Sequence, residues 1–185
     1  MVLPGFMTTD GSTVALRAFL SSRGHRVAGW GLGRNLGNVG KLAPRVADLL
    51  ARQSRAAGAP LHLVGWSLGG VLAREATRLQ PDAVAQIITM GTPVVGGPKY
   101  TATADRYRAR GVDLDALERQ VAERNAEALP VPITALYSRK DAVVAWQACL
   151  DPNPDNDVDH VEVAARHMEM GFSAEVLRAV AGRIE

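Results

Sequence analysis

Residues 65–70 read GWSLGG, so Ser67 has one glycine two positions before it and another two positions after it. An apolar run at 60–66 precedes Ser67 and a helical pattern at 67–79 includes it, which predicts a strand, a sharp turn and a helix. Glycine removes the side chains that such a turn would bring into collision. The Ser67 hydroxyl would be exposed beside a helix N-terminus, where the Leu68 amide could stabilise an oxyanion. The pattern therefore predicts a nucleophilic serine, and a glycine-rich turn with an idle serine is the alternative.

A serine hydroxyl is a weak nucleophile at neutral pH unless a base takes its proton and a carboxylate orients that base. Asp141 follows the strand expected at 131–138 by three residues, and His167 follows the strand expected at 160–164 by three residues. In a parallel sheet the carboxyl ends of the strands meet at one edge, so both side chains would reach the edge that holds Ser67. The sequence therefore predicts a triad of Ser67, Asp141 and His167.

Other acidic residues and histidines fit other positions better. The other aspartates considered lie in a charged helical segment or before the last strand: Asp113, Asp115, Asp151, Asp155, Asp157 and Asp159. The other histidines precede, open or belong to expected strands, where structural roles suit them: His25, His62 and His160. Asp141 has an alternative role as a helix cap, because aspartate is a preferred N-cap residue.

Short β-prone runs alternate with helical patterns along the chain. Six strands are expected, at 1–6, 25–30, 60–66, 83–91, 131–138 and 160–164, and the main helices are expected at 12–23, 41–57, 67–79, 102–128 and 173–184. This alternation predicts an α/β fold with a mostly parallel sheet and helices on both faces. A chain of 185 residues suits one domain over 1–185, with residues 95–129 inserted over the sheet.

These motifs resemble the α/β-hydrolase family, and more narrowly its small esterases and lipase-like members. The resemblance runs from LPGF at 3–6 through GWSLGG, GTPVVGG and YSRKDAVV to RHMEMGF, and the triad order of serine, acid and histidine is that of the family. It implies a three-layer α/β-hydrolase fold in a minimal form that lacks the first strands. It also implies that the insertion at about 95–129 is a small helical lid.

The resemblance further implies a second oxyanion donor in the loop after the first strand. The backbone N–H of Phe6 is the first candidate by position and that of Met7 is the alternative. The sequence departs from many relatives in two places. Pro4 stands where they often have histidine, and Met168 stands where they have a glycine just after the histidine of the triad.

The expected function is that of a serine carboxylic-ester hydrolase, of esterase or lipase type, that acts on a small-molecule ester through an acyl-enzyme. Ser67, His167 and Asp141 would be nucleophile, base and orienting acid, and the amides of Phe6 and Leu68 would hold the oxyanion. No metal or organic cofactor is required. A thioesterase, an amidase or an acyltransferase would use the same triad, and a non-catalytic binding module could share the fold.

The composition argues against several other classes of protein. The formal net charge is +2 and the charges are interspersed, which does not favour nucleic-acid binding. No stretch reaches the length of a membrane span, and no signal peptide is seen, so a cytoplasmic location is expected. Cys149 is the single cysteine, so no intrachain disulfide is expected and a buried inert thiol is favoured.

Two weaker patterns concern binding. Residues 151–162 follow the ligand spacing of a calcium loop, but Asn156 replaces the turn glycine and two prolines stiffen the segment, so a simple turn is favoured. If two strands before the first one are missing, the strand at 25–30 would be an exposed edge. An exposed edge strand could pair with another copy to form a homodimer.

Overall fold

The computed structural model describes residues 1–184, with a parallel sheet of five strands at its centre. The strands lie in sequence order across the sheet: β1 (Val2–Leu3), β2 (Leu61–Trp66), β3 (Val84–Met90), β4 (Ile133–Tyr137) and β5 (Val158–Glu162). Gly65 of β2 pairs with Thr89 of β3, and Thr89 pairs with Ala135 of β4. All four pairs of neighbours are parallel, so their carboxyl ends meet at one edge of the sheet.

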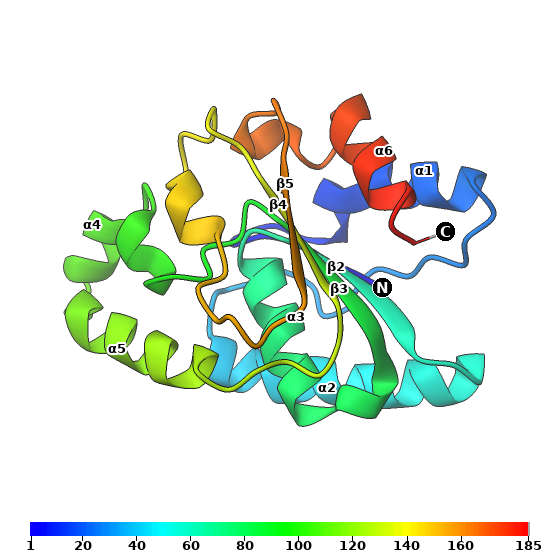
Figure 1. Cartoon of the computed structure of the whole chain (residues 1–185), viewed down its shortest axis with the longest axis horizontal. Helices are drawn as coiled ribbons and strands as arrows, with labels where there is room; N and C mark the ends of the chain where they lie inside the picture. The colour runs from blue at the N-terminus through cyan, green and yellow to red at the C-terminus, as the bar shows by residue number, and fades with distance from the viewer. Residues whose placement is uncertain (185) are drawn as a thin grey trace.

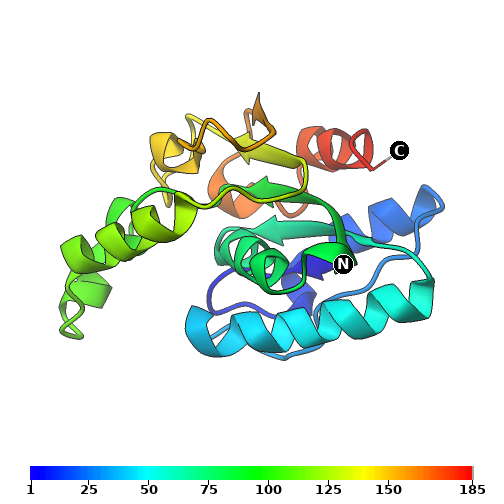
Figure 2. The same ribbon diagram turned by 60° about the horizontal axis from the view of Figure 1, so that its bottom comes forward.

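Helices cover both faces of the sheet and complete three layers (Figures 1 and 2). One face carries α1 (Val14–Ser22) and α6 (Ala174–Ala181), and the other carries α2 (Val39–Ala57) and α3 (Leu68–Leu79). This arrangement confirms the expected α/β class with helices on both faces. It also explains why most residues of the central strands are apolar, since both of their faces are covered.

The two cores follow from the alternation of side chains along each strand. Leu63 of β2 packs in the core with α2 and α3, whereas its neighbour Val64 packs in the core with α1 and α6. Ile87 and Ile88 of β3 divide between the same two cores in the same way. The two cores therefore pack against both faces of the sheet. They hold in place the edge from which the loops after the strands extend.

The segment between β3 and β4 contains two helices where one helical stretch was expected over 102–128. After the short 3-10 turn η3 (Gly97–Tyr100), α4 (Ala104–Arg108) and α5 (Leu114–Asn125) are separate. Gly111 has a φ of +76° between them, which ends the first helix. Asp113 then starts α5, because its carboxylate accepts the N–H groups of Asp115 and Ala116 at 3.0 and 2.9 Å.

The strand expected at 25–30 is not formed, so the sheet has five strands and not six. Only Gly29 makes a single parallel bridge to β1. At the end of this run, Asp10 on the 3-10 turn η1 (Asp10–Thr13) accepts the N–H groups of Trp30 and Gly31 at 3.0 Å each. These amides are therefore not available for a sheet ladder. The edge strand on which the homodimer prediction rested is absent from residues 1–184.

The remaining short turns are 3-10 segments that lie close to strand ends: η2 (Pro81–Ala83), η4 (Trp146–Cys149) and η5 (His167–Glu169). Among the helices within residues 1–184, none is long and apolar enough to cross a membrane.

Candidate active site

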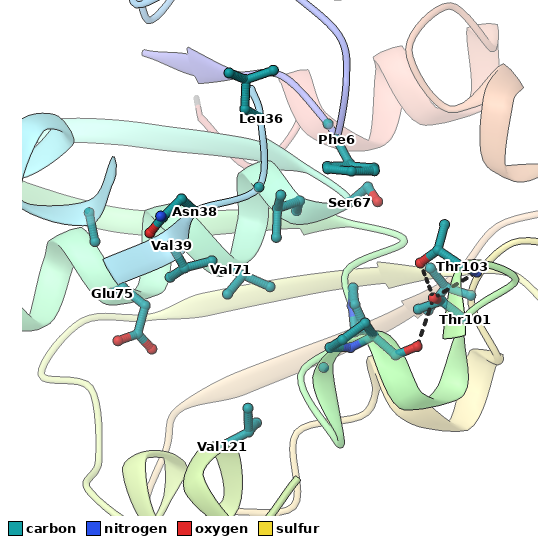
Figure 3. A pocket seen from close by; sticks show the side chains of 18 of the residues that line it. Phe6, Leu36, Asn38, Val39, Ser67, Val71, Glu75, Thr101, Thr103 and Val121 are labelled. Atoms are coloured by element: carbon teal, nitrogen blue, oxygen red, sulfur yellow. Dashed lines mark hydrogen bonds between the residues drawn. The ribbon is translucent and has the colours of Figure 1, made fainter. Parts of the chain in front are cut away.

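The turn between β2 and α3 holds Ser67 in a strained conformation. Its φ is +54° and its ψ is −122°, a region that side-chain-bearing residues rarely adopt. The Ser67 N–H donates to the Met90 carbonyl at 2.7 Å, and the Thr92 hydroxyl donates to the Ser67 carbonyl at 2.9 Å. The end of β3 therefore holds the turn through both backbone groups of the serine. Figure 3 shows the Ser67 side chain at the pocket that it lines.

Glycine is sterically required on both sides of this serine. A Cβ atom on Gly65 would overlap the backbone of Gly70, and a Cβ atom on Gly69 would overlap the carbonyl of Leu3. The overlaps involve backbone atoms, which cannot move aside without distorting the sheet. The spacing of glycines around Ser67 therefore reflects close backbone approach, as the sequence indicates.

Asp141 and His167 are joined by a buried hydrogen bond. Asp141 Oδ2 lies 2.7 Å from His167 Nδ1, and the two side chains are 1% and 6% exposed. The other oxygen, Oδ1, accepts the N–H groups of Val143 and Val144 at 2.8 Å each. Because a carboxylate only accepts hydrogen bonds, Nδ1 carries the proton and Nε2 is the nitrogen left to act as an acceptor. Asp141 therefore caps a turn, as its alternative role suggested, and also orients the imidazole.

The structure brings the three residues of the expected triad to one region. Ser67 and His167 line the same pocket, and Asp141 lies behind His167. Gly91, directly after β3, makes room for the pair, since a Cβ atom there would come within 3.0 Å of both Asp141 Oδ2 and His167 Nδ1. The sequence reasoning assigned no role to Gly91 or Thr92. Their position at the end of a strand in the same sheet was the signal available.

Asn35 fixes the loop after β1 and was also missed. It is buried, and its side-chain amide donates to the Pro4 carbonyl at 2.9 Å. Its backbone carbonyl accepts the Met7 N–H at 2.7 Å, and its own N–H donates to the Thr8 carbonyl at 2.9 Å. The loop at 4–8 is therefore tied to residue 35 at three points. An asparagine within the glycine-rich stretch 30–37 was the only signal for it in the sequence.

These contacts separate the two candidates for the second oxyanion donor. The Met7 amide is occupied by the Asn35 carbonyl. Within residues 1–184, neither the amide of Phe6 nor that of Leu68 donates to a protein acceptor. Both residues line the pocket with Ser67, and Figure 3 shows Phe6 next to the serine. The Phe6 and Leu68 amides are therefore available as donors to an oxyanion, whereas the Met7 amide is not.

The pocket has a volume of about 930 Å³, which is in the range of small-molecule sites. Its walls come from the loop after β1, the start of α2, one face of α3, and the α4–α5 segment. Aliphatic side chains from α2, α3 and α5 line part of it: Val39, Ala43, Val71, Leu117 and Val121. Such a lining suits an apolar group of a substrate.

Two of the other histidines, His62 and His160, and the cysteine are engaged away from Ser67. His62 Nδ1 accepts from Gln86 Nε2 at 2.8 Å, and burial lowers the pKa of His62. His160 Nε2 accepts the Asp151 N–H at 2.9 Å. Burial raises the pKa of the Cys149 thiol to about 12, which makes it a poor nucleophile.

The aspartate-rich loop uses its first carboxylate internally. Asp151 pairs with Arg74 at 2.7 Å and accepts from the Asn153 N–H and from the Asn156 side chain, both at 3.0 Å. Across residues 1–184, no three histidine, cysteine or acidic side chains gather in a group that could hold a metal ion. The ion pair between Arg74 and Asp151 therefore joins this loop to α3.

Solved structures share this arrangement of strands and helices. The mouse alpha/beta hydrolase domain-containing protein 10 has 23% sequence identity and a TM-score of 0.64, with 99% of this chain covering 86% of that one. Lipase BlEst2 from Bacillus licheniformis has 13% identity and a TM-score of 0.75, with 99% covering 90%. Lipase B from Aspergillus fumigatus has 15% identity and a TM-score of 0.71, and there 97% of this chain spans only 51% of the lipase.

At these identities the likeness establishes the fold. The chain has the α/β-hydrolase fold, as the sequence motifs indicate, in a form with five parallel strands. No protein-family model matches the sequence, and no curated protein matches it either.

Proposed function

We propose that the chain is a serine hydrolase that cleaves carboxylic esters through an acyl-enzyme, with Ser67, Asp141 and His167 as its triad. The observation that carries the proposal is the buried 2.7 Å bond between Asp141 and His167 Nδ1, next to the pocket that Ser67 and His167 share. This bond selects the imidazole tautomer in which Nε2 can accept a proton. The solved hydrolases and lipases of the same fold support the general class of reaction.

In the proposed reaction, Ser67 Oγ attacks the ester carbonyl carbon while His167 Nε2 takes the hydroxyl proton. The bond from that carbon to the alcohol oxygen then breaks, and His167 gives the proton to the leaving oxygen, which releases the alcohol and leaves the acyl-enzyme. A water molecule repeats the attack with the same base, and the acid departs as Ser67 recovers its proton. Asp141 holds the imidazole in place and stabilises the imidazolium that forms in each step.

The amides of Leu68 and Phe6 are the proposed donors to the oxyanion. Leu68 is the first residue of α3, so its N–H has no acceptor within the helix and lies at the positive end of the helix dipole. The Asn35 contacts hold the loop that carries Phe6. A preorganised donor of this kind contributes roughly 10²- to 10³-fold to kcat.

The helical segment at about 95–129 is proposed to be a small lid-like insertion in a single domain. Residues from α4 and α5, including Tyr107 and Val121, form one wall of the pocket. The Phe6 and Tyr107 rings lie 6.4 Å apart, so this wall reaches the loop of the proposed oxyanion site.

Covalent labelling and turnover test the proposal together. The native protein should hydrolyse a p-nitrophenyl ester and gain one fluorophosphonate adduct by intact mass. Ser67→Ala should lose both properties, and His167→Ala should strongly reduce both. Ser21→Ala is the matched control, because Ser21 is exposed on α1.

The outcomes separate the alternatives. Turnover by Ser67→Ala at the native rate would overturn the assignment of the nucleophile. A folded native protein with neither turnover nor an adduct would favour a non-catalytic binding module. A clear preference for thioesters or amides over oxygen esters would retain the site and overturn the ester assignment.

A further inference from the structure

The pocket continues away from Ser67 as a groove along α3. Ser67, Val71 and Glu75 are spaced four residues apart, so they lie on one face of the helix, and all three line the pocket. Figure 3 shows them one after another along the cavity. Glu75 is eight residues beyond Ser67, so a rise of 1.5 Å per residue places it roughly 12 Å farther along the helix. The groove therefore has a defined length from the proposed nucleophile to its far end.

Several walls of the groove are aliphatic. Val39 and Ala43 belong to α2, Val71 to α3, and Leu117 and Val121 to α5. An extended hydrocarbon chain advances roughly 1.25 Å per bond, given C–C bonds near 1.5 Å and tetrahedral angles. A span of roughly 12 Å therefore corresponds to about ten bonds of such a chain.

The far end of the groove is charged. Glu75 lies 3.2 Å from Arg124 on α5 and 3.9 Å from Arg78 on α3. The charged side chains that line the pocket are one glutamate and three arginines, the third being Arg110. Arg110 acts on Tyr107, whose ring lies 6.4 Å from that of Phe6, so Arg110 is not counted with the charges at the far end. The groove thus ends in two guanidinium groups and one carboxylate, and a guanidinium with free donors suits a chain with an anion at its end.

Arg78 is engaged in structural contacts more fully than Arg124. Arg78 donates to the Glu127 carbonyl at 2.7 Å and to the Asn125 side chain at 3.3 Å, so it ties α3 to the end of α5. Its Nε is buried without an acceptor. Arg124 has Glu75 as its partner in the ion pair, and its side chain is 41% exposed. The Arg124 guanidinium therefore keeps donors that a ligand could use.

We propose that the groove binds the acyl chain of the ester, about ten bonds long, and that Arg124 binds an anionic group at the far end of this chain. The inference rests on the function proposed above. The acyl part remains attached to Ser67 through both chemical steps, so a groove that starts at the serine holds it throughout. A carboxylate matches the guanidinium in two parallel hydrogen bonds, and a phosphate shares this chemistry.

Chain-matched esters test the proposal. The p-nitrophenyl esters should have an acyl chain of ten carbons that ends in a methyl, a carboxylate, a phosphate or a trimethylammonium group. The native protein should prefer an anionic end over methyl by about tenfold or more in kcat/KM, since a hydrogen bond to a charged group is among the strong ones. The carboxylate and phosphate arms identify which anion fits better, and the preference should weaken at high salt.

Substitution of Arg124 then assigns the preference to the far end of the groove. Arg124→Gln should bring the ratio between the carboxylate and methyl esters close to one. Arg119→Gln is the matched control on the same helix, because Arg119 is exposed and does not line the pocket. It should keep the native ratio. Thermal unfolding of both variants checks that α5 stays folded.

Failure of this inference differs from failure of the proposed function. If the native protein hydrolyses p-nitrophenyl acetate but prefers the methyl or trimethylammonium chain end, the anion site is refuted and the hydrolase proposal stands. An unchanged ratio in Arg124→Gln also refutes the anion site. Absence of acetate turnover together with absence of a fluorophosphonate adduct would instead refute the function.

Discussion

Asp141→Asn tests the proposed triad with almost no change of shape. Two backbone N–H groups, from Val143 and Val144, donate to Oδ1 at 2.8 Å each. In the variant these donors require an oxygen, so the amide oxygen takes that place and the NH₂ group must face His167 Nδ1. An NH₂ group donates, so Nδ1 becomes the acceptor and the imidazole proton moves to Nε2. Nε2 then cannot accept the proton of Ser67.

The expected effect is large in kcat and small in stability. A wrong imidazole tautomer in a serine triad lowers kcat by about 10⁴-fold, which corresponds to roughly 5.4 kcal/mol in the activation barrier. KM should change little, since Asp141 does not line the pocket. Both hydrogen bonds to Oδ1 survive, so the free energy of unfolding should fall by only about 1 kcal/mol, the contribution of an ordinary hydrogen bond.

The assay is hydrolysis of p-nitrophenyl butyrate by purified variants, with thermal unfolding measured in parallel. Asp159→Asn is the control, because Asp159 lies on β5 and its exposed carboxylate pairs with Arg183 at 2.7 Å. This control should keep the native kcat. If the Asp141→Asn variant unfolds at the native temperature yet retains a tenth or more of the native kcat, the assignment of Asp141 as the residue that orients His167 is refuted.

Buried groups elsewhere provide three further tests. Arg74→Leu should lower the free energy of unfolding, measured in urea, by about 3–5 kcal/mol, because it leaves Asp151 buried without its ion-pair partner. Adding Asp151→Leu should restore most of this free energy. No recovery in the double variant would contradict this. Burial raises the pKa of Cys149 to about 12, so at neutral pH a disulfide reagent should modify it only as the protein unfolds, and fast labelling of the native state would contradict burial. Burial lowers the pKa of His62 from 6.5, so its contribution to stability is present above pH 6.5 and is lost as the pH falls. His62→Gln should therefore lose less stability on acidification, and an unchanged pH dependence would contradict this.

The positions of the candidate triad could be predicted because they depend on few facts about the fold. In a parallel sheet, the loops after different strands lie along one edge, so the order of strands in the sequence places Ser67, Asp141 and His167 near one another. The structure has His167 bonded to Asp141 and on the same pocket as Ser67. Their catalytic roles stay predictions until the variants are measured.

The features that were missed depend on contacts between distant residues. The run at 25–30 is locally β-prone, but Asp10 takes the N–H group of Trp30, its last residue, and that of Gly31, the next residue. Asn35 likewise acts on the loop at 4–8, about thirty residues earlier in the chain. A periodicity argument considers one window at a time, so it cannot detect a side chain that competes for backbone groups from outside that window.

The groove, too, could be predicted from the sequence only in part. The four-residue spacing of Ser67, Val71 and Glu75 is visible in the sequence, whereas the packing of α5 opposite them is not. The segment at 95–129 was expected to be a lid, but the sequence did not indicate that Arg124 lines the pocket. Ser67 and Glu75 flank or belong to one buried helix, so the distance between them stays constant if the α4–α5 segment shifts. The length of the bound chain is therefore set by α3, while Arg124 on α5 controls how tightly its charged end is held.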